Sequence, residues 1–129
     1  MPNSVVHFEI GCRYREKSTS FYQQLFEWEM TPGEISTDIR TDAESAVAQA
    51  IGGHIVSLGH EPFHYTNFYV GVSSAAEYLA KAEALGGKLL IHPVRLPNGS
   101  TFAWFADIDG NTIGLLSREQ AEEPVAQGD

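Results

Sequence analysis

The fold of this 129-residue chain is indicated most directly by the stretch Asp107-Ile108-Asp109-Gly110-Asn111-Thr112-Ile113-Gly114-Leu115-Leu116. Asp109-Gly110 is a two-residue turn signal, because both central positions of such a turn favour a positive φ. Strand-forming residues precede it at 101–106 and follow it at 112–116. We therefore predict a β-hairpin that closes the last part of the fold.

The elements before this hairpin occur in the same order twice. In the first copy, residues 5–12 alternate between apolar and polar, which predicts a half-buried strand. A helix over about residues 16–27 follows, with an apolar stripe made of Phe21, Tyr22, Leu25 and Phe26. We predict further strands at 28–30, 35–40, 45–50 and 54–58, with a turn at Gly52-Gly53.

The second copy begins with a strand at residues 65–72. Ser74-Ala75-Ala76-Glu77 is a capping box that opens a helix, and Gly86-Gly87 ends it. The apolar stripe of this helix consists of Tyr78, Leu79, Ala82 and Leu85. A strand at 88–92, an edge or loop at 93–97, a turn at Asn98-Gly99 and the closing hairpin complete the copy.

The two copies also match residue by residue. A shift of 60 places residues 5–12 over 65–72, and a shift of 57 places 52–58 over 109–115. The predicted fold class is therefore α+β, with two βαβββ modules at about 5–58 and 65–117. We expect one domain over residues 1–117 and a polar tail at 118–129.

Composition and charge exclude several classes of protein. The hydrophobic fraction is 43%, which is typical of a globular protein, and the net charge of -9 leaves no basic surface for nucleic acid. The single cysteine, Cys12, excludes an internal disulfide, and its apolar surroundings predict a buried thiol. No signal peptide or membrane-spanning stretch is recognisable, so we expect a cytoplasmic protein that uses no membrane.

The opening strand with His7, the stretch 20–28, the stretch 84–88 and above all 105–115 resemble the vicinal oxygen chelate superfamily. This superfamily contains glyoxalase I, bleomycin-resistance proteins and extradiol dioxygenases, and its closing hairpin reads aspartate–proline–aspartate–glycine–asparagine. The resemblance covers about residues 5–117 and is greatest to small glyoxalase-related single-domain proteins. It implies paired modules that form a curved mixed sheet around a cleft, commonly in a homodimer.

The resemblance also implies where a metal would be bound. Catalytic members hold a divalent metal with a His or Gln on the first strand of each module and a Glu on the last. His7 matches a first-strand ligand, but its repeat partner is Asn67, and the glutamate position falls on Gly114, with Ser57 as repeat partner. One imidazole remains where such a site needs three or four groups. We expect no resident cofactor; the alternative is a divalent metal held by His7 with Glu9 or with a group from a partner subunit.

Alternation along the strands places several polar groups on the face toward the cleft. Of the neighbours Trp104 and Phe105, one must face the cleft, unless both belong to the core. The candidate ligand-binding residues are His7, Glu9, Asn67, Tyr69, Trp104 and Phe105. A structural role for His7 and Glu9, as hydrogen-bonding groups within the sheet, is the alternative for those two.

These residues predict a protein that binds a small organic molecule in its cleft without a catalytic metal. The alternative is a metal-dependent lyase, isomerase or dioxygenase, and no catalytic residue is assigned. His60-Glu61-Pro62-Phe63-His64 satisfies the zinc-protease pattern, but Pro62 disfavours the helix that this mechanism requires. We therefore predict a loop there, and surface positions for His54 and His92.

Overall fold

The computed structural model describes residues 2–41 and 50–118, and these form two compact units. The N-terminal unit is Val6–Phe68, and the C-terminal unit is Met1–Val5 with Tyr69–Asp129. The described residues contain eight strands and two helices in the order β-α-β-β-β, β-α-β-β-β. The α+β class and the two predicted βαβββ modules are therefore confirmed. The predicted strand at 45–50 lies almost wholly outside the described residues.

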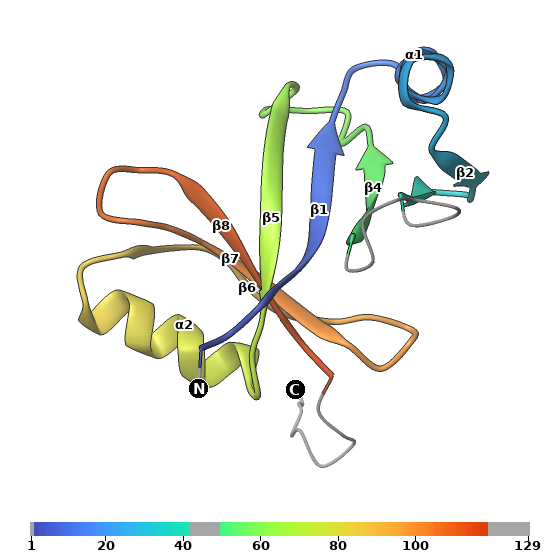
Figure 1. Ribbon diagram of the computed structural model, residues 1–129. Helices are drawn as coiled ribbons and strands as arrows, with labels where there is room; N and C mark the ends of the chain where they lie inside the picture. Colours follow the sequence, from blue (N-terminus) through green and yellow to red (C-terminus); the bar gives the residue numbers. More distant parts are fainter. Residues whose placement is uncertain (1, 42–49, 119–129) are drawn as a thin grey trace. The chain divides into compact units, whose positions relative to one another are not determined.

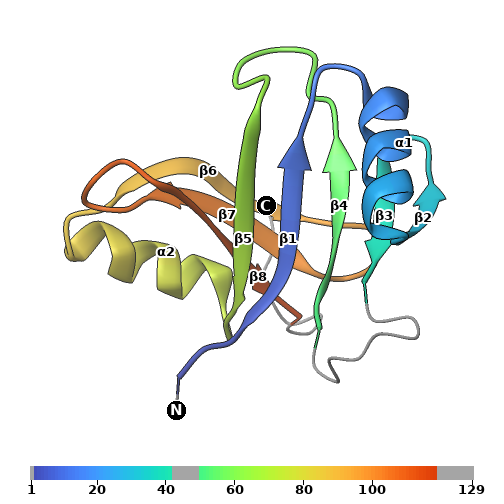
Figure 2. The same ribbon diagram turned by 45° about the horizontal axis from the view of Figure 1, so that its top comes forward.

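Four strands and one helix make up the first module. They are β1 (Val5–Gly11), α1 (Arg15–Phe26), β2 (Glu29–Pro32), β3 (Ser36–Arg40) and β4 (Gly52–Val56). The strands lie in the order β2-β3-β4-β1, with β1 and β4 parallel and the other neighbours antiparallel. Helix α1 runs beside β3 and β4 (Figure 2).

The second module repeats this arrangement. Its elements are β5 (Tyr65–Gly71), α2 (Ala75–Ala84), β6 (Lys88–Arg95), β7 (Thr101–Ala106) and β8 (Thr112–Ser117). The strands lie in the order β5-β8-β7-β6, with β5 and β8 parallel (Figure 1). Strand β5 spans the boundary between the units at Phe68 and Tyr69. Strand β6 continues to Arg95, into the predicted edge or loop at 93–97, and its pairing with β7 shifts between Ile91 and Val94, next to Pro93.

The register corrects the predicted alignment of the last strands. Glu9 pairs with His54 in the first module, and Tyr69 pairs with Gly114 in the second. Since Glu9 and Tyr69 are 60 residues apart, His54 and not Ser57 is the repeat partner of Gly114. The shift of 57 was wrong because Gly52 and Gly53 are strand residues, not a turn. A Cβ on Gly53 would lie 2.4 Å from the carbonyl oxygen of Phe8, so glycine permits close packing there.

The closing hairpin has a longer connection than the two-residue turn that we predicted. Ala106 pairs with Thr112, so five residues join the strands, and Gly110 has a φ of 92° whereas Asp109 does not have a positive φ. The Asp107 carboxylate accepts hydrogen bonds from the backbone N–H groups of Asp109 and Asn111, both at 2.9 Å. The side chain of Asp107 thus organises the turn, and the pKa of Asp107 is lowered chiefly by its hydrogen bonds to Asn111.

The two helices are packed differently. In α2, Leu79 is buried in a core with Ala75, Ala103 and Leu115, and the Ser74 hydroxyl accepts the N–H of Glu77 at 3.2 Å, as the capping box predicts. Leu85, however, is 79% exposed. Within α1, which is described in full, no side chain is buried.

The predicted apolar stripe of α1 is therefore largely wrong. Phe21, Leu25 and Phe26 are all more than half exposed. Only Tyr22 reaches the core, where its ring stacks on Trp28 with the centroids 5.5 Å apart. Trp28, two residues after the end of α1, packs against the same core and also contacts the ring of Phe26, with the centroids 5.1 Å apart.

Two further predictions are confirmed. Cys12 is buried, and its thiol donates to the carbonyl of Val56. Residues 60–64 contain bends and no helix, so the zinc-protease pattern lacks its structural context. Among the described helices, none has the length and apolar character to cross a membrane.

Candidate functional site

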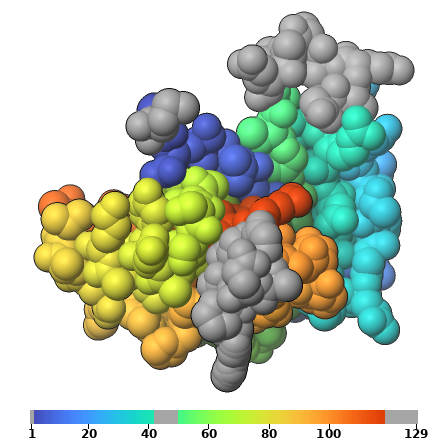
Figure 3. All heavy atoms as spheres, turned by 90° about the horizontal axis from the view of Figure 1, so that it is seen from below, coloured from blue at the N-terminus to red at the C-terminus, as the bar shows by residue number. Residues whose placement is uncertain are grey.

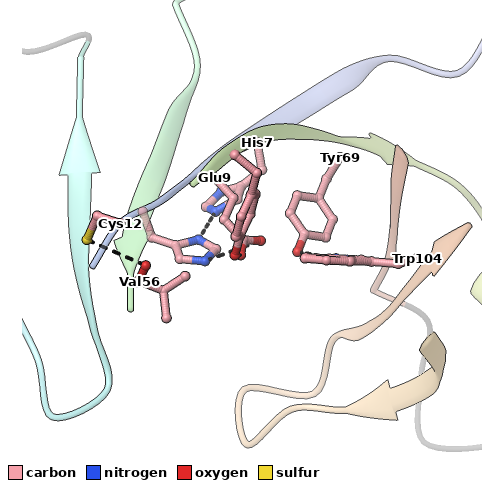
Figure 4. Close-up of polar contacts among 8 residues, drawn as sticks. His7, Glu9, Cys12, Val56, Tyr69 and Trp104 are labelled. Carbon is pink, nitrogen blue, oxygen red and sulfur yellow. Dashed lines mark hydrogen bonds and ion pairs between the residues drawn. The ribbon is translucent and has the colours of Figure 1, made fainter. Parts of the chain in front are cut away.

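A cluster of polar side chains lies on one face of the N-terminal unit (Figure 4). Alternation places His7 and Glu9 on the same face of β1, and the parallel register puts His54 of β4 beside Glu9. His7 Nε2 lies 2.8 Å from His54 Nδ1, and His54 Nε2 lies 3.6 Å from Glu9 Oε1. The Tyr65 hydroxyl donates to Glu9 Oε2. We call these four residues the His-Glu cluster.

Burial keeps both imidazoles of the cluster neutral near pH 7. The pKa of His7 is lowered to about 4, chiefly by burial and then by the neighbouring His54, against an opposing effect of Asp38. Burial also lowers the pKa of His54, although Glu9 and Asp38 oppose the shift. The contact between the rings is therefore a hydrogen bond between neutral imidazoles, and not a repulsion between two cations.

One tautomer satisfies every contact of His54. With the proton on His54 Nε2, this atom faces the Glu9 carboxylate, and Nδ1 accepts the N–H of His7 Nε2. The result is a line of contacts from a buried carboxylate through two imidazoles.

Glycine at position 11 makes room for Tyr65. A Cβ on Gly11 would lie 2.1 Å from the ring of Tyr65, so the ring occupies the place of a side chain there. From that place the hydroxyl reaches Glu9, which is only 3% exposed. Burial, followed by the hydrogen bond to Glu9, raises the pKa of Tyr65, so the phenol remains a donor.

Sequence reasoning missed Tyr65 and His54 as members of this cluster. Tyr65 carried a usable signal, because period two along β5 places it on the face of Asn67 and Tyr69. His54 was predicted at the surface, yet it is half-buried. Its role depends on the register between β1 and β4, which the sequence alone does not give.

Asn67 is the least satisfied side chain of this face. It is 4% exposed, and neither its Nδ2 nor its Oδ1 has a hydrogen-bond partner among the described residues. Alternation along β5 places it on the same face as Tyr65. Buried polar atoms of native proteins nearly always have partners, and leaving one without a partner costs about 1–3 kcal/mol. An amide whose donor and acceptor both lack a protein partner among the described residues is therefore a candidate contact for a ligand or for a buried water molecule.

The remaining candidates lie in the C-terminal unit. The Trp104 indole N–H donates to the Tyr69 hydroxyl at 2.8 Å, and both residues are buried (Figure 4). The ring of Tyr69 fills the space beside Gly114, where a Cβ would lie 2.4 Å from it. Phe105 packs instead against the core that contains Leu79. Of the two neighbouring aromatic residues, Trp104 therefore shares the face of Tyr69, and Phe105 has the opposite face.

The four positions that the resemblance associates with a metal do not fit one. After correction of the register they are occupied by His7, His54, Asn67 and Gly114. This set has two imidazoles in place of the one expected, but it has no carboxylate. The Tyr69 ring excludes a carboxylate side chain at position 114, and Glu9 is engaged by Tyr65. In the part of the chain that the structure describes, no three His, Cys, Asp or Glu side chains are grouped to hold a metal ion.

The fold is shared with solved structures of low sequence identity. A variant of Streptomyces coelicolor methylmalonyl-CoA epimerase, in complex with 2-nitronate-propionyl-CoA, matches with a TM-score of 0.67 at 14% identity, over 90% of this chain and 97% of the epimerase. The Mycobacterium tuberculosis epimerase matches with a TM-score of 0.67 at 12% identity, over 90% of this chain and 88% of that one. A hypothetical protein from Bacillus halodurans C-125 matches with a TM-score of 0.66 at 12% identity, over 96% of this chain and 100% of that one.

Sequence comparison identifies the family. No curated protein matches this chain. The profile of one superfamily matches residues 4–115, which is most of the chain and includes both modules. The element order and the shared fold agree with that match. The chain belongs to the Glyoxalase/Bleomycin resistance protein/Dioxygenase superfamily.

Proposed function

We propose that this protein binds a small organic molecule at the face that carries the His-Glu cluster and Asn67, and that it does so without a bound metal. The observation that supports this most is the buried Asn67 amide, whose donor and acceptor both lack a partner among the described residues. A ligand with an adjacent acceptor and donor would satisfy both atoms. Family membership adds support, since the scaffold is used for small-molecule sites.

The charges of the chain favour a ligand that is neutral or cationic. A ligand at this face would lie near the Glu9 carboxylate and two neutral imidazoles, which provide no positive charge. The Streptomyces coelicolor epimerase structure holds 2-nitronate-propionyl-CoA, and phosphate groups such as those of CoA are usually bound by Lys and Arg. A chain with a net charge of -9 is poorly suited to such a ligand.

Proton transfer is the second candidate function, and the line of contacts from Glu9 through His54 to His7 favours it. In that arrangement His7 accepts a proton from the bound molecule, and the two groups behind it orient its ring. A pKa of about 4 makes His7 a weak base, however, whereas an effective general base has a pKa near the working pH. The site therefore supports binding better than catalysis.

Nuclear magnetic resonance of the Asn67 side-chain amide tests the proposal. We would titrate the protein with 2-pyrrolidone, benzamidine and benzoate as representatives of a neutral amide, a cation and an anion. We expect the Asn67 amide signals to shift with the neutral or cationic probe and not with benzoate. If none of the three probes moves these signals, or benzoate alone does, the proposal is wrong.

A pair of variants separates binding from folding. Asn67→Leu has a similar shape without the unpaired amide, so we expect it to raise the free energy of unfolding by about 1 kcal/mol and to abolish probe binding. Thr66→Val is the matched control, because Thr66 is exposed and precedes Asn67 on the same strand. Probe binding by Asn67→Leu at the level of the control would contradict the proposal.

A further inference from the structure

A groove in the C-terminal unit has a chemistry different from that of the His-Glu cluster. Its volume is about 330 Å³, which lies within the range of small-molecule sites. One wall is α2, which lies at the surface of this unit in the yellow part of Figure 3. This wall consists of Tyr78, Lys81, Ala82 and Leu85, whose spacing of three and four residues places them along one side of the helix.

The opposite wall is apolar. It is formed by side chains of β5, β7 and β8, among them Phe105 and Ile113. Leu85 forms the rim at the C-terminal end of α2 and is 79% exposed. An exposed leucine beside an apolar groove leaves hydrophobic surface available for a ligand.

The groove has one charged lining residue among those described. The Lys81 ammonium lies 4.6 Å from the centroid of the Tyr78 ring, which holds the positive charge on the helix side of the groove. The other polar lining residue besides Tyr78 is Asn3, whose side chain is uncharged. A cation beside an apolar channel is complementary to a molecule with an anionic head and a hydrocarbon body.

The dimensions limit the length of that body. Tyr78 and Leu85 are seven residues apart, which corresponds to about 10 Å along a helix. An extended hydrocarbon chain advances roughly 1.3 Å per carbon, so about eight carbons span this distance. We propose that this groove binds a straight-chain aliphatic carboxylate of about eight to ten carbons, with the chain along α2 and the carboxylate at Lys81. The groove and the His-Glu cluster have no residue in common, so each proposal can fail without the other.

Calorimetric titration with carboxylates of increasing length tests the fit. We would use hexanoate, octanoate, decanoate, dodecanoate and tetradecanoate below their micellar concentrations. Burying one methylene is worth about 0.8 kcal/mol, so affinity should rise about fourfold per carbon as far as decanoate and then level off. A rise that continues to tetradecanoate would indicate partition onto an open surface, and absence of binding by octanoate and decanoate would equally overturn the proposal.

Substitutions on α2 locate the bound chain. Ala82→Phe places a ring in the groove and should weaken decanoate binding more than tenfold. Ala80→Phe is the matched control, because Ala80 is exposed on the same helix and does not line the groove, and it should bind as the wild type does. If circular dichroism shows that Ala82→Phe does not fold, Leu85→Gln replaces it and should weaken binding several-fold. Wild-type affinity in the folded blocking variant would overturn the proposal.

The position of the carboxylate is tested separately. Lys81→Met keeps the apolar stem and removes the charge, so decanoate should bind about threefold to fivefold more weakly, as expected for an exposed ion pair. Decan-1-ol should bind equally to both proteins. Lys88→Met, on β6 and outside the groove, is the control and should leave both ligands unaffected. Equal weakening of decanoate by the two lysine variants would mean that only net charge matters and would overturn the assignment of Lys81.

Discussion

The two modules have the same arrangement of strands and helix, but they carry different side chains at equivalent positions. Glu9 beside His54 in the first module corresponds to Tyr69 beside Gly114 in the second, in the same parallel register. The first pair belongs to a cluster of a carboxylate, two imidazoles and a phenol. In the second, the Tyr69 ring fills the space at the glycine and accepts a hydrogen bond from Trp104.

This difference shows that duplication of the strands did not duplicate the chemistry. His7, Glu9 and His54 of the first module correspond to Asn67, Tyr69 and Gly114 of the second, so an amide, a phenol ring and a glycine stand in place of two imidazoles and a carboxylate. The helices differ in how well they are packed. Helix α2 buries Leu79, whereas α1 buries no side chain along its described length. The first module thus carries three of the four cluster residues, with Tyr65 supplied by β5, and the second module carries the better packed helix.

The largest effect that we predict compares the two helices. Leu79→Ala removes a side chain that is 4% exposed and should lower the free energy of unfolding by about 3 kcal/mol, through lost burial and a cavity. Leu25→Ala, on the predicted stripe of α1, is 58% exposed and should change it by less than about 0.5 kcal/mol. Urea denaturation measures both. Similar losses in the two variants would show that α1 is packed as tightly as α2.

The sequence allowed the order of elements along the chain, the two modules and the capping of α2 to be predicted, because alternation and capping are local patterns. It did not allow the packing of α1 to be predicted, because Phe21, Leu25 and Phe26 satisfy the same spacing whether or not a sheet covers them. His54 was missed for a related reason. Its place beside Glu9 depends on register, and Gly52-Gly53 was interpreted as a turn when these glycines serve close strand packing.

The candidate site was predicted in part. Alternation placed His7, Glu9, Asn67 and Tyr69 on the polar face, and the structure places His7 and Glu9 in one cluster. Alternation did not reveal that Gly11 accommodates Tyr65, because a glycine in a strand does not identify the side chain that approaches it. Whether these side chains meet a ligand stays a prediction.

The second prediction concerns Gly114, which occupies the position in the second module that His54 occupies in the first. Gly114→Ala brings a methyl group to 2.4 Å from the Tyr69 ring, and the required shift should lower the free energy of unfolding by about 2 kcal/mol. Gly59→Ala is the control, with a φ of 82° and no atom within 4 Å, so it has only backbone strain of about 1 kcal/mol. Urea denaturation of both variants separates crowding from strain. A smaller loss for Gly114→Ala than for the control would contradict the close approach of Tyr69.

The third prediction is a loss of stability between pH 7 and pH 5 that arises from His7 in the first module. The pKa of His7 is about 4 in the folded chain and near 6.5 in the unfolded chain. Between pH 6.5 and pH 4, therefore, the His7 imidazole becomes protonated in the unfolded chain but stays neutral in the folded one. Stability is therefore highest above pH 6.5 and falls as the pH decreases toward 4, by an amount on the order of 1 kcal/mol because the ring is partly exposed. Denaturation at pH 7 and pH 5 should show a smaller fall for His7→Gln than for the wild type. A His7 resonance that titrates near 6.5 would contradict this prediction.

The smallest effect that we predict comes from the N-cap residue, which directly precedes each helix. Ser74 caps α2 through its hydroxyl, whereas Tyr14 occupies the corresponding position of α1 and makes no side-chain capping hydrogen bond. Tyr14 has a φ of -125° and a ψ of 102°, the extended conformation that a capping serine adopts, and it is 62% exposed. Tyr14→Ser should therefore raise the free energy of unfolding by about 0.5 kcal/mol, because the added hydroxyl can accept a helix N–H while the contact between Lys17 and the Tyr14 ring is lost. Ser74→Ala should lower it by about 1 kcal/mol for the converse reason. Thermal denaturation measures the change in stability of both variants. Destabilisation by Tyr14→Ser would mean that the aromatic ring stabilises α1 more than a capping hydroxyl does.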